Sequence, residues 1–94
     1  MKLDWFRLKA ESNLKDHGVS FEEATTVFDD PLVDMVPDLL HSFDETRFAA
    51  IGTSTQDRLL VVVFTERGDT IHIITAREVT PKERRHYESH DYDS

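Results

Sequence analysis

The sequence contains no cysteine and only three glycines, and these shortages exclude several classes of protein. Without cysteine, disulfide bonds, thiolate metal sites and cysteine nucleophiles are excluded. The glycines are isolated, so the glycine-rich loops that bind nucleotide phosphates are missing. No apolar run approaches the about 18 residues of a membrane span, and charge at Asp4 and Arg7 argues against a signal peptide. We therefore expect a cytoplasmic protein without a membrane segment.

Basic residues are also scarce, since 11 Lys and Arg stand against 19 Asp and Glu and the net charge is -8. Residues 16–46 hold nine acidic residues and no Lys or Arg, whereas residues 77–87 hold four basic and two acidic residues. This balance argues against non-specific binding of duplex DNA, which depends on clustered cations. The acidic segment either keeps the protein soluble or docks a basic partner, and both interpretations stay open.

What the sequence does contain is one dense apolar hairpin. Residues 59–64 form an unbroken apolar run, residues 71–74 are rich in β-branching, and turn-forming residues 66–69 separate them. Because both faces of these strands are apolar, we expect them at the centre of a sheet. The length of the chain fits a single domain over residues 1–94.

Two loops fit this hairpin. A two-residue loop at Arg67 and Gly68 would place Glu66 opposite Asp69, and like charges in that position are unfavourable. We therefore predict a three-residue loop of residues 66–68, with Gly68 in the left-handed conformation. The predicted cross-strand pairs are Val63 with Ile71, Val62 with His72, Val61 with Ile73, and Leu60 with Ile74.

Two helices are predicted ahead of the hairpin, after a short edge strand at residues 3–5. The first covers residues 7–17, with Gly18 as its left-handed cap. The second starts at Ser20, which forms a capping box with Glu23, and it ends before Pro31. The apolar face predicted for the first helix consists of Phe6, Ala10, Leu14 and His17, and that of the second of Phe21, Ala24, Val27 and Phe28.

The remaining elements complete an α+β fold. Residues 32–36 are a weak strand candidate, residues 37–45 an acidic loop and residues 47–54 a strand. Residues 80–83 combine an N-cap, a proline and a reciprocal glutamate, which indicates a helix start, and we expect residues 89–94 to fray. The order predicts an antiparallel sheet of three to four strands with two N-terminal helices and a C-terminal helix, mainly on one face.

The candidate site residues are arginines, a lysine and histidines. His72 interrupts an apolar strand, where a polar group needs a hydrogen-bond partner or a cleft, so structural and functional roles both stay open. Arg47 and Arg77, at neighbouring strand ends, can bind a phosphodiester or pair with nearby glutamates. His86 and His90 have a metal-binding spacing but lie near the chain end, and we expect them to be solvated. The other members of the set are Lys9, His17, Arg58, Arg84 and Arg85.

Motifs along almost the whole chain resemble those of the BrnT toxin family. They are residues 9–13, 17–24, 27–31, Arg47 with Ile51 and Gly52, residues 71–77, and Glu83, Arg84 and Tyr87. The resemblance implies a RelE-like fold and a ribonuclease that stops growth by cutting RNA and inhibiting translation. Where the family usually has arginine, serine, a basic residue and an Asp-Pro pair, this chain has His72, Thr75, Asp16 and Phe6-Arg7.

The site residues and the resemblance together lead us to expect a metal-independent endoribonuclease without a cofactor. In that reaction the RNA 2′-hydroxyl attacks the adjacent phosphate, which requires a proton acceptor, a proton donor and positive charge. We assign Arg47 and Arg77 to the phosphate and His72 to proton transfer. Lys9 and His17 are the supporting residues, and Arg58, Arg84 and Arg85 are expected to bind RNA.

The resemblance also implies a BrnA-like ribbon-helix-helix antitoxin, through which alone the protein would contact DNA. A second hypothesis is a weakly active or inactive toxin-like module that binds this antitoxin and takes part in autoregulation of its operon. The acidic segment of residues 16–45 motivates the second hypothesis.

Overall fold

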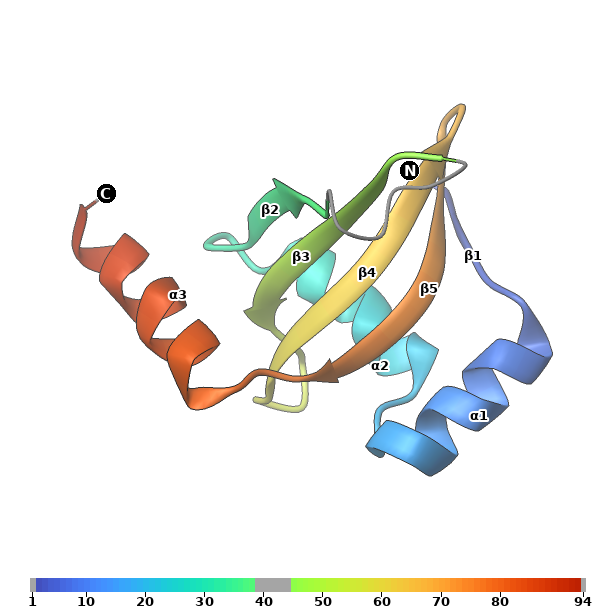
Figure 1. Cartoon of the computed structure of the whole chain (residues 1–94), viewed down its shortest axis with the longest axis horizontal. Helices are drawn as coiled ribbons and strands as arrows, with labels where there is room; N and C mark the ends of the chain where they lie inside the picture. Colours follow the sequence, from blue (N-terminus) through green and yellow to red (C-terminus); the bar gives the residue numbers. More distant parts are fainter. Residues whose placement is uncertain (1, 39–44, 94) are drawn as a thin grey trace.

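The computed structural model describes residues 2–38 and 45–93, with backbone alone for residues 90–93. Helices pack against a sheet of five strands in the order β1-β5-β4-β3-β2 (Figure 1). Only β1 and β5 run parallel. The elements are β1 (Lys2–Asp4), α1 (Arg7–His17), α2 (Phe21–Thr25), the 3-10 helix η1 (Thr26–Asp29), β2 (Asp34–Pro37), β3 (Arg47–Thr53), β4 (Leu59–Arg67), β5 (Thr70–Glu78) and α3 (Pro81–Asp93).

The predicted α+β class is confirmed, with a larger sheet than expected. The sheet has five strands instead of three or four, because the short segments β1 and β2 pair with the central strands as edges. The predicted acidic loop lies largely outside the described residues. Helix α3 extends to Asp93, through most of the segment that we expected to fray. None of the helices in the described ranges is long and apolar enough to cross a membrane.

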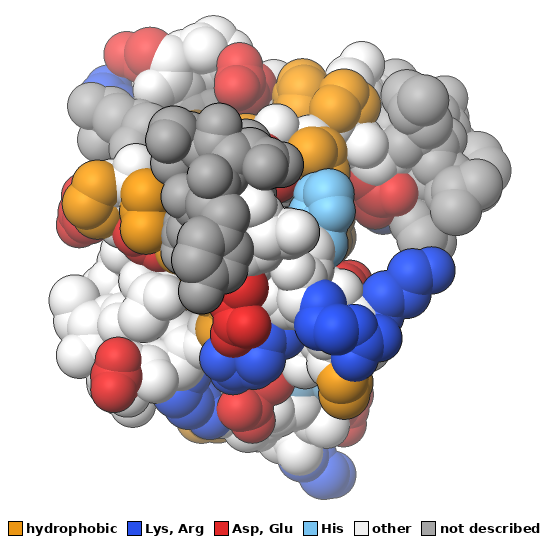
Figure 2. Space-filling view, turned by 90° about the vertical axis from the view of Figure 1, so that its left-hand side faces the viewer, with side chains coloured by type: hydrophobic (Ala, Val, Ile, Leu, Met, Phe, Trp, Pro, Cys, Tyr) orange, Lys and Arg blue, Asp and Glu red, His pale blue; other side chains and the backbone are white. Residues whose placement is uncertain are grey.

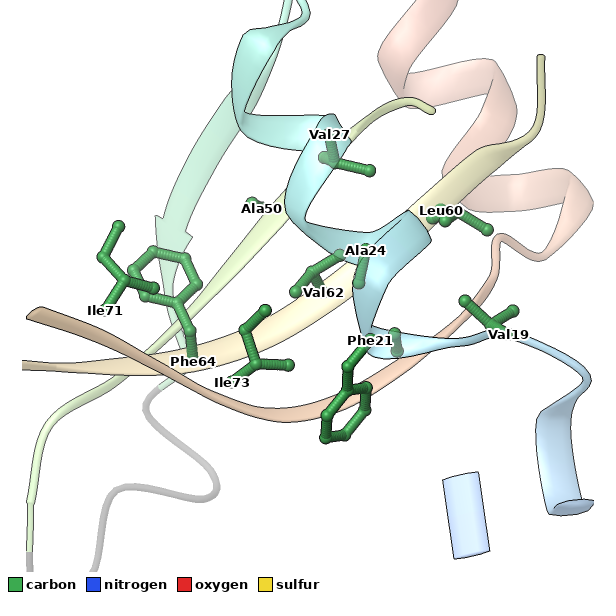
Figure 3. Close-up of a cluster of buried hydrophobic side chains, with 11 residues drawn as sticks. Val19, Phe21, Ala24, Val27, Ala50, Leu60, Val62, Phe64, Ile71 and Ile73 are labelled. Carbon is green, nitrogen blue, oxygen red and sulfur yellow. The ribbon is translucent and has the colours of Figure 1, made fainter. Parts of the chain in front are cut away.

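The main core lies between the sheet and the α2–η1 segment, which crosses the back of the sheet in Figure 1. Phe21, Ala24 and Val27 are fully buried, as their spacing predicts, and they pack on strand residues such as Val62 and Phe64 (Figure 3). Ser20 accepts a hydrogen bond from the Glu23 amide at 3.0 Å, so the predicted helix start is confirmed.

Helix α3 packs on the opposite face through Tyr87, which joins a small cluster with Ile51, Leu59 and Val61. The Tyr87 hydroxyl donates a hydrogen bond of 2.7 Å to Asp30 at the end of η1. Burial raises the pKa of Asp30, but hydrogen bonds from Thr53, Leu32 and Tyr87 outweigh it and hold the pKa below its ordinary value. Asp30 thus remains ionised while it joins α3 to the helical layer.

Helix α1 docks through a polar residue, contrary to the predicted apolar face. Phe6 and Leu14 are 64% and 53% exposed, whereas Asn13 is 3% exposed. The Asn13 amide donates hydrogen bonds to the carbonyls of Val19 and Ala76 at 2.9 and 2.8 Å, and it accepts one from the Ala76 amide at 3.1 Å. The side chain therefore pairs with the edge of β5 beyond the end of β1, and this contact outweighs the helical apolar pattern.

The hairpin register differs from both predicted loops. Arg67 pairs with Thr70, so the loop consists of Gly68 and Asp69, with Gly68 at a φ of 63°. A glycine with positive φ in the first position of a two-residue loop matches the twist of the flanking strands. His72 lies opposite Thr65 instead of Val62, and Ile74 has no partner in β4 because the register shifts between Val63 and Phe64. The hairpin therefore contains a β-bulge that the sequence pattern did not indicate.

Candidate active site

The sheet face opposite α2 is hollowed into an open cleft of about 540 Å³. Ala49, Ile51, Val61 and Val63 supply most of its apolar lining, because alternate residues of β3 and β4 face away from the helical core. Val36 and Ile74 complete it. The charged residues of the lining are Asp38, Arg47, Arg77 and Glu83. Arg47 and Arg77, predicted together as phosphate ligands, both line this cleft. They do not lie at neighbouring strand ends as predicted, because Arg47 is level with Thr65 and Arg77 with Val61, four residues further along β4.

The bulge in β5 decides which side chains reach this face. Because side chains alternate along a strand, His72 and Arg77 would point to opposite faces of a regular strand. The unpaired Ile74 adds one residue between them, and the partners of His72 and Arg77, Thr65 and Val61, lie on the same side of β4. His72 and Arg77 therefore share the face that carries the cleft.

Arg77 is held by Glu83 at the start of α3. Two guanidinium nitrogens donate to the two carboxylate oxygens at 2.8 and 2.9 Å, and the first also donates to the Glu78 carbonyl at 3.1 Å. Glu83 also accepts a hydrogen bond from the Thr80 amide at 2.8 Å and completes the capping box of α3. These contacts, that of Arg77 above all, lower the pKa of Glu83 from 4.5 to about 2 against the effect of burial.

His72 is buried, and its partner is a carboxylate. Nδ1 lies 2.6 Å from an oxygen of Asp4, which β1 places beside it through parallel pairing with β5. The Phe6 ring meets the imidazole at 69°, with 4.8 Å between centroids. A carboxylate at Nδ1 fixes the orientation of the ring and favours the tautomer with its proton on that nitrogen. The histidine is thus satisfied by hydrogen bonding, and it also lines a second cleft, of about 190 Å³.

Arg47 lines both clefts. The second cleft also contains Lys9, Arg67 and Glu45, and Arg67 lies 3.3 Å from Glu45. Arg47 can therefore contact a ligand that extends from His72 in one cleft to Arg77 in the other. Figure 2 shows Lys and Arg side chains beside Asp and Glu side chains instead of one continuous basic surface.

An ion pair that the sequence pattern did not indicate holds Arg58 away from the two clefts. Its guanidinium binds both oxygens of Glu23, one from Nε at 2.9 Å, and donates to the Gly18 carbonyl at 3.0 Å. Glu23 is 4% exposed, and the hydrogen bond from Arg58 holds its pKa below the ordinary value despite burial. The carboxylate that we assigned to a capping box instead joins the α1–α2 turn to the start of β4, and Arg58 is engaged there, outside both clefts.

Three other predicted residues also lie apart from the two clefts. His17 is exposed in the last turn of α1, eight residues from Lys9, which is about 12 Å along a helix. Arg84 lines a separate hollow with Asp57 and Glu88 and lies 3.7 Å from Glu88, and Arg85 is exposed on α3. His86, which we expected to be solvated, is exposed and lies 3.8 Å from Asp34, and the side chain of His90 lies outside the described part of the chain. The structure thus brings together Lys9, Arg47, His72 and Arg77, and separates His17, Arg58, Arg84 and Arg85 from them.

Sequence reasoning missed Asp4 and Phe6 as neighbours of His72. Asp4 reaches His72 because β1 adds to the sheet edge in parallel, and a strand of three residues carries little pairing information. Phe6 was assigned to the buried face of α1 because of its helical spacing. The need of a buried imidazole for a partner was the one available signal, and it does not identify that partner.

Comparisons with known proteins identify the family and the fold. A family model described as "Ribonuclease toxin, BrnT, of type II toxin-antitoxin system" matches residues 5–83. The chain belongs to the BrnT family. The crystal structure of the Brucella abortus ribonuclease toxin BrnT, at 1.1 Å resolution, superposes with a TM-score of 0.67 and 22% sequence identity, and the match covers 85% of this chain and 97% of that one. No curated protein sequence matches. A BrnT fold in a type II toxin family implies an antitoxin as partner.

Proposed function

We propose that this BrnT-family protein is a metal-independent endoribonuclease that cuts single-stranded RNA, inhibits translation and is neutralised by a BrnA-like antitoxin. The observation that carries the proposal is the position of Arg47 between the clefts that hold His72 and Arg77. Guanidinium groups on either side of a phosphodiester stabilise the charge that develops as the 2′-oxygen attacks.

His72 is the proposed proton acceptor. With Nδ1 held by Asp4, the neutral ring can take the 2′-hydroxyl proton at Nε2. The 2′-oxygen then bonds to phosphorus, and the bond to the 5′-oxygen of the next nucleotide breaks. That oxygen takes a proton from water, and the hydroxide that remains takes the proton back from His72 Nε2. The products are a 2′,3′-cyclic phosphate, a 5′-hydroxyl and the neutral imidazole. A phosphate bound at Arg77 competes with the Glu83 carboxylate, so part of the binding free energy goes into breaking this ion pair.

Cleavage of single-stranded RNA by single variants tests the proposal. His72→Asn, which can keep the hydrogen bond to Asp4, should lower the rate about 100-fold or more, as expected for loss of acid–base catalysis. Arg47→Ala and Arg77→Ala should each lower the cleavage rate about 100-fold, because the charge that develops on the phosphate is then less well stabilised. The controls are His86→Asn and Lys15→Ala, which change an exposed imidazole and an exposed cation outside both clefts. Unchanged cleavage in His72→Asn and Arg77→Ala, with folding confirmed by thermal melting, would remove both residues from the mechanism.

A second candidate function is a binding module with little nuclease activity. It is favoured by the carboxylates that already bind Arg77 and Arg58, and by the net charge of -8. Growth arrest on expression of this chain alone supports the nuclease. Normal growth together with co-purification of a DNA-binding antitoxin supports the module.

A further inference from the structure

The second cleft combines an exposed aromatic ring with several cations. Phe6, at the N-cap of α1, is 64% exposed, and its side chain makes no capping hydrogen bond. Lys9 lies one helical turn later, and Arg47 and Arg67 come from β3 and β4. Glu45 is the one carboxylate among the described residues that line this cleft, against these three cations. The cleft is therefore locally positive in a protein that is acidic as a whole.

This combination matches the chemistry of unpaired RNA. Single-stranded nucleic acids offer a flat π face for stacking and a negative backbone, and their binding sites combine aromatic side chains with cations. The cleft volume, about 190 Å³, is below the roughly 300 Å³ at which sites for drug-sized molecules begin, so it suits one planar ring. Arg47 connects it to the larger cleft, so a base here would lie next to the phosphate bound between Arg47 and Arg77.

We propose that the second cleft is a nucleobase subsite, in which one unpaired base stacks on Phe6 next to Lys9 while Arg47 and Arg77 bind the phosphate beside it. The proposal rests on the proposed ribonuclease function for the identity of the ligand. Phe6 is a binding residue in this subsite, and His72 lies at its inner side, next to the Phe6 ring.

Binding of a labelled single-stranded RNA with 2′-O-methyl riboses, which cannot be cleaved by 2′-hydroxyl attack, tests the subsite. Phe6→Ala should weaken binding about 5- to 100-fold, the range expected for loss of stacking on one base. Phe6→Trp should bind at least as tightly as the unmodified protein. The matched control is Leu8→Ala, since Leu8 is 70% exposed on the same helix and lies outside the cleft. Duplex RNA should bind weakly, and equally, to the unmodified protein and to the three variants.

The outcomes separate this subsite from the nuclease. If the protein cleaves no RNA but single-strand binding still depends on an aromatic residue at position 6, the subsite stands without the reaction. If Phe6→Ala binds like the unmodified protein, or if Leu8→Ala weakens binding equally, the subsite is wrong while the cleavage assays stand. Unchanged RNA binding together with weaker antitoxin binding would assign Phe6 to a protein interface and overturn the proposal.

Discussion

Glu83 connects the start of a helix with an arginine of the candidate site. Its carboxylate accepts hydrogen bonds from the Thr80 amide and from two nitrogens of Arg77. Removal of the carboxylate therefore affects the cap of α3 and the orientation of Arg77 together. Because its pKa in the folded protein is about 2 instead of 4.5, the effect on stability depends on pH.

Glu83→Gln should lower the free energy of unfolding at neutral pH, and this difference from the unmodified protein should disappear in acid. The depressed pKa means that ionised Glu83 contributes fully above about pH 4.5, and that the contribution is lost as the pH falls toward about 2. Because the Glu83 side chain is 29% exposed, solvent screens the ion pair, and we expect the free energy of unfolding to fall by about 1–2 kcal/mol at neutral pH. Thermal or urea unfolding of both proteins between about pH 2 and pH 7 measures the difference. A difference that does not change with pH would show that the ion pair has no part in it.

Half of the site residues that we predicted from residue type lie in the two clefts. Arg47, His72 and Arg77 could be proposed together because cations and an imidazole are conspicuous in and around apolar strands. Their common face depends on the bulge at Ile74, and nothing in an alternating apolar pattern indicates an extra residue. Arg58 was misplaced because its partner Glu23 also fits a capping box, and local spacing cannot distinguish the two roles.

At the scale of elements, one buried amide joins α1 to the sheet. Asn13 makes three buried hydrogen bonds, two of them to the backbone of Ala76. The outer surface of α1 keeps Leu8 and Leu14 exposed, so apolar burial contributes less here than in α2. The position of Phe6 and Lys9 relative to β5 therefore depends on this polar contact.

Asn13→Ala should loosen α1 and destabilise the protein by about 2–4 kcal/mol, because it leaves the buried amide and carbonyl of Ala76 without partners. Hydrogen exchange of the Ala76 amide should rise more than that of amides in β4. The control is Ser12→Ala, since the neighbouring Ser12 hydroxyl makes only an exposed hydrogen bond within the helix. Equal exchange at Ala76 in both variants would contradict this account of how α1 is held.

Local signals predicted most elements, and long-range pairing was the part that failed. The capping residues Ser20 and Thr80 marked two helix starts, and Gly18 the end of α1, because these signals act within a few residues. The predicted loop of the central hairpin was wrong because neither loop considered placed Gly68 first and Asp69 second, the arrangement in which Glu66 faces Ile71 instead of Asp69. The face of α1 was wrong because an asparagine that pairs with a strand edge has no periodic signature.

At the scale of the whole molecule, exposed carboxylates of the helical side lie apart from the cations of the clefts. Residues 16–46 carry nine acidic and no Lys or Arg residues, and Glu22 and Asp29 are exposed on the helical side. The clefts on the other face gather Lys9, Arg47 and Arg77, and Asp38, Glu45 and Glu83 line them as well. The exposed carboxylates of the helical side and the cations of the clefts would give a basic partner and the proposed RNA different surfaces.

Glu22→Gln with Asp29→Asn should slow association with a basic antitoxin several-fold at low salt, because opposite charges steer the encounter. The difference should shrink as salt rises, since screening acts within about 10 Å at 0.1 M. Stopped-flow association rates measure it. Glu66→Gln with Asp69→Asn, at the hairpin tip, makes the same change in net charge elsewhere. If both pairs slow association equally, total charge rather than the acidic region governs the encounter.

The way Asn13 closes one border of the sheet bears on how the protein avoids aggregation. Along β5, β1 occupies the border as far as His72, and the Asn13 amide satisfies the backbone at Ala76. The opposite border is β2, a four-residue strand that begins with Asp34 and ends with Pro37, which has no amide hydrogen. Shortness, charge and proline all discourage a stray chain from adding as a further strand. At the first border, β1 has only three residues, and two of them, Lys2 and Asp4, are charged. Both borders of the described sheet therefore carry features that discourage such addition.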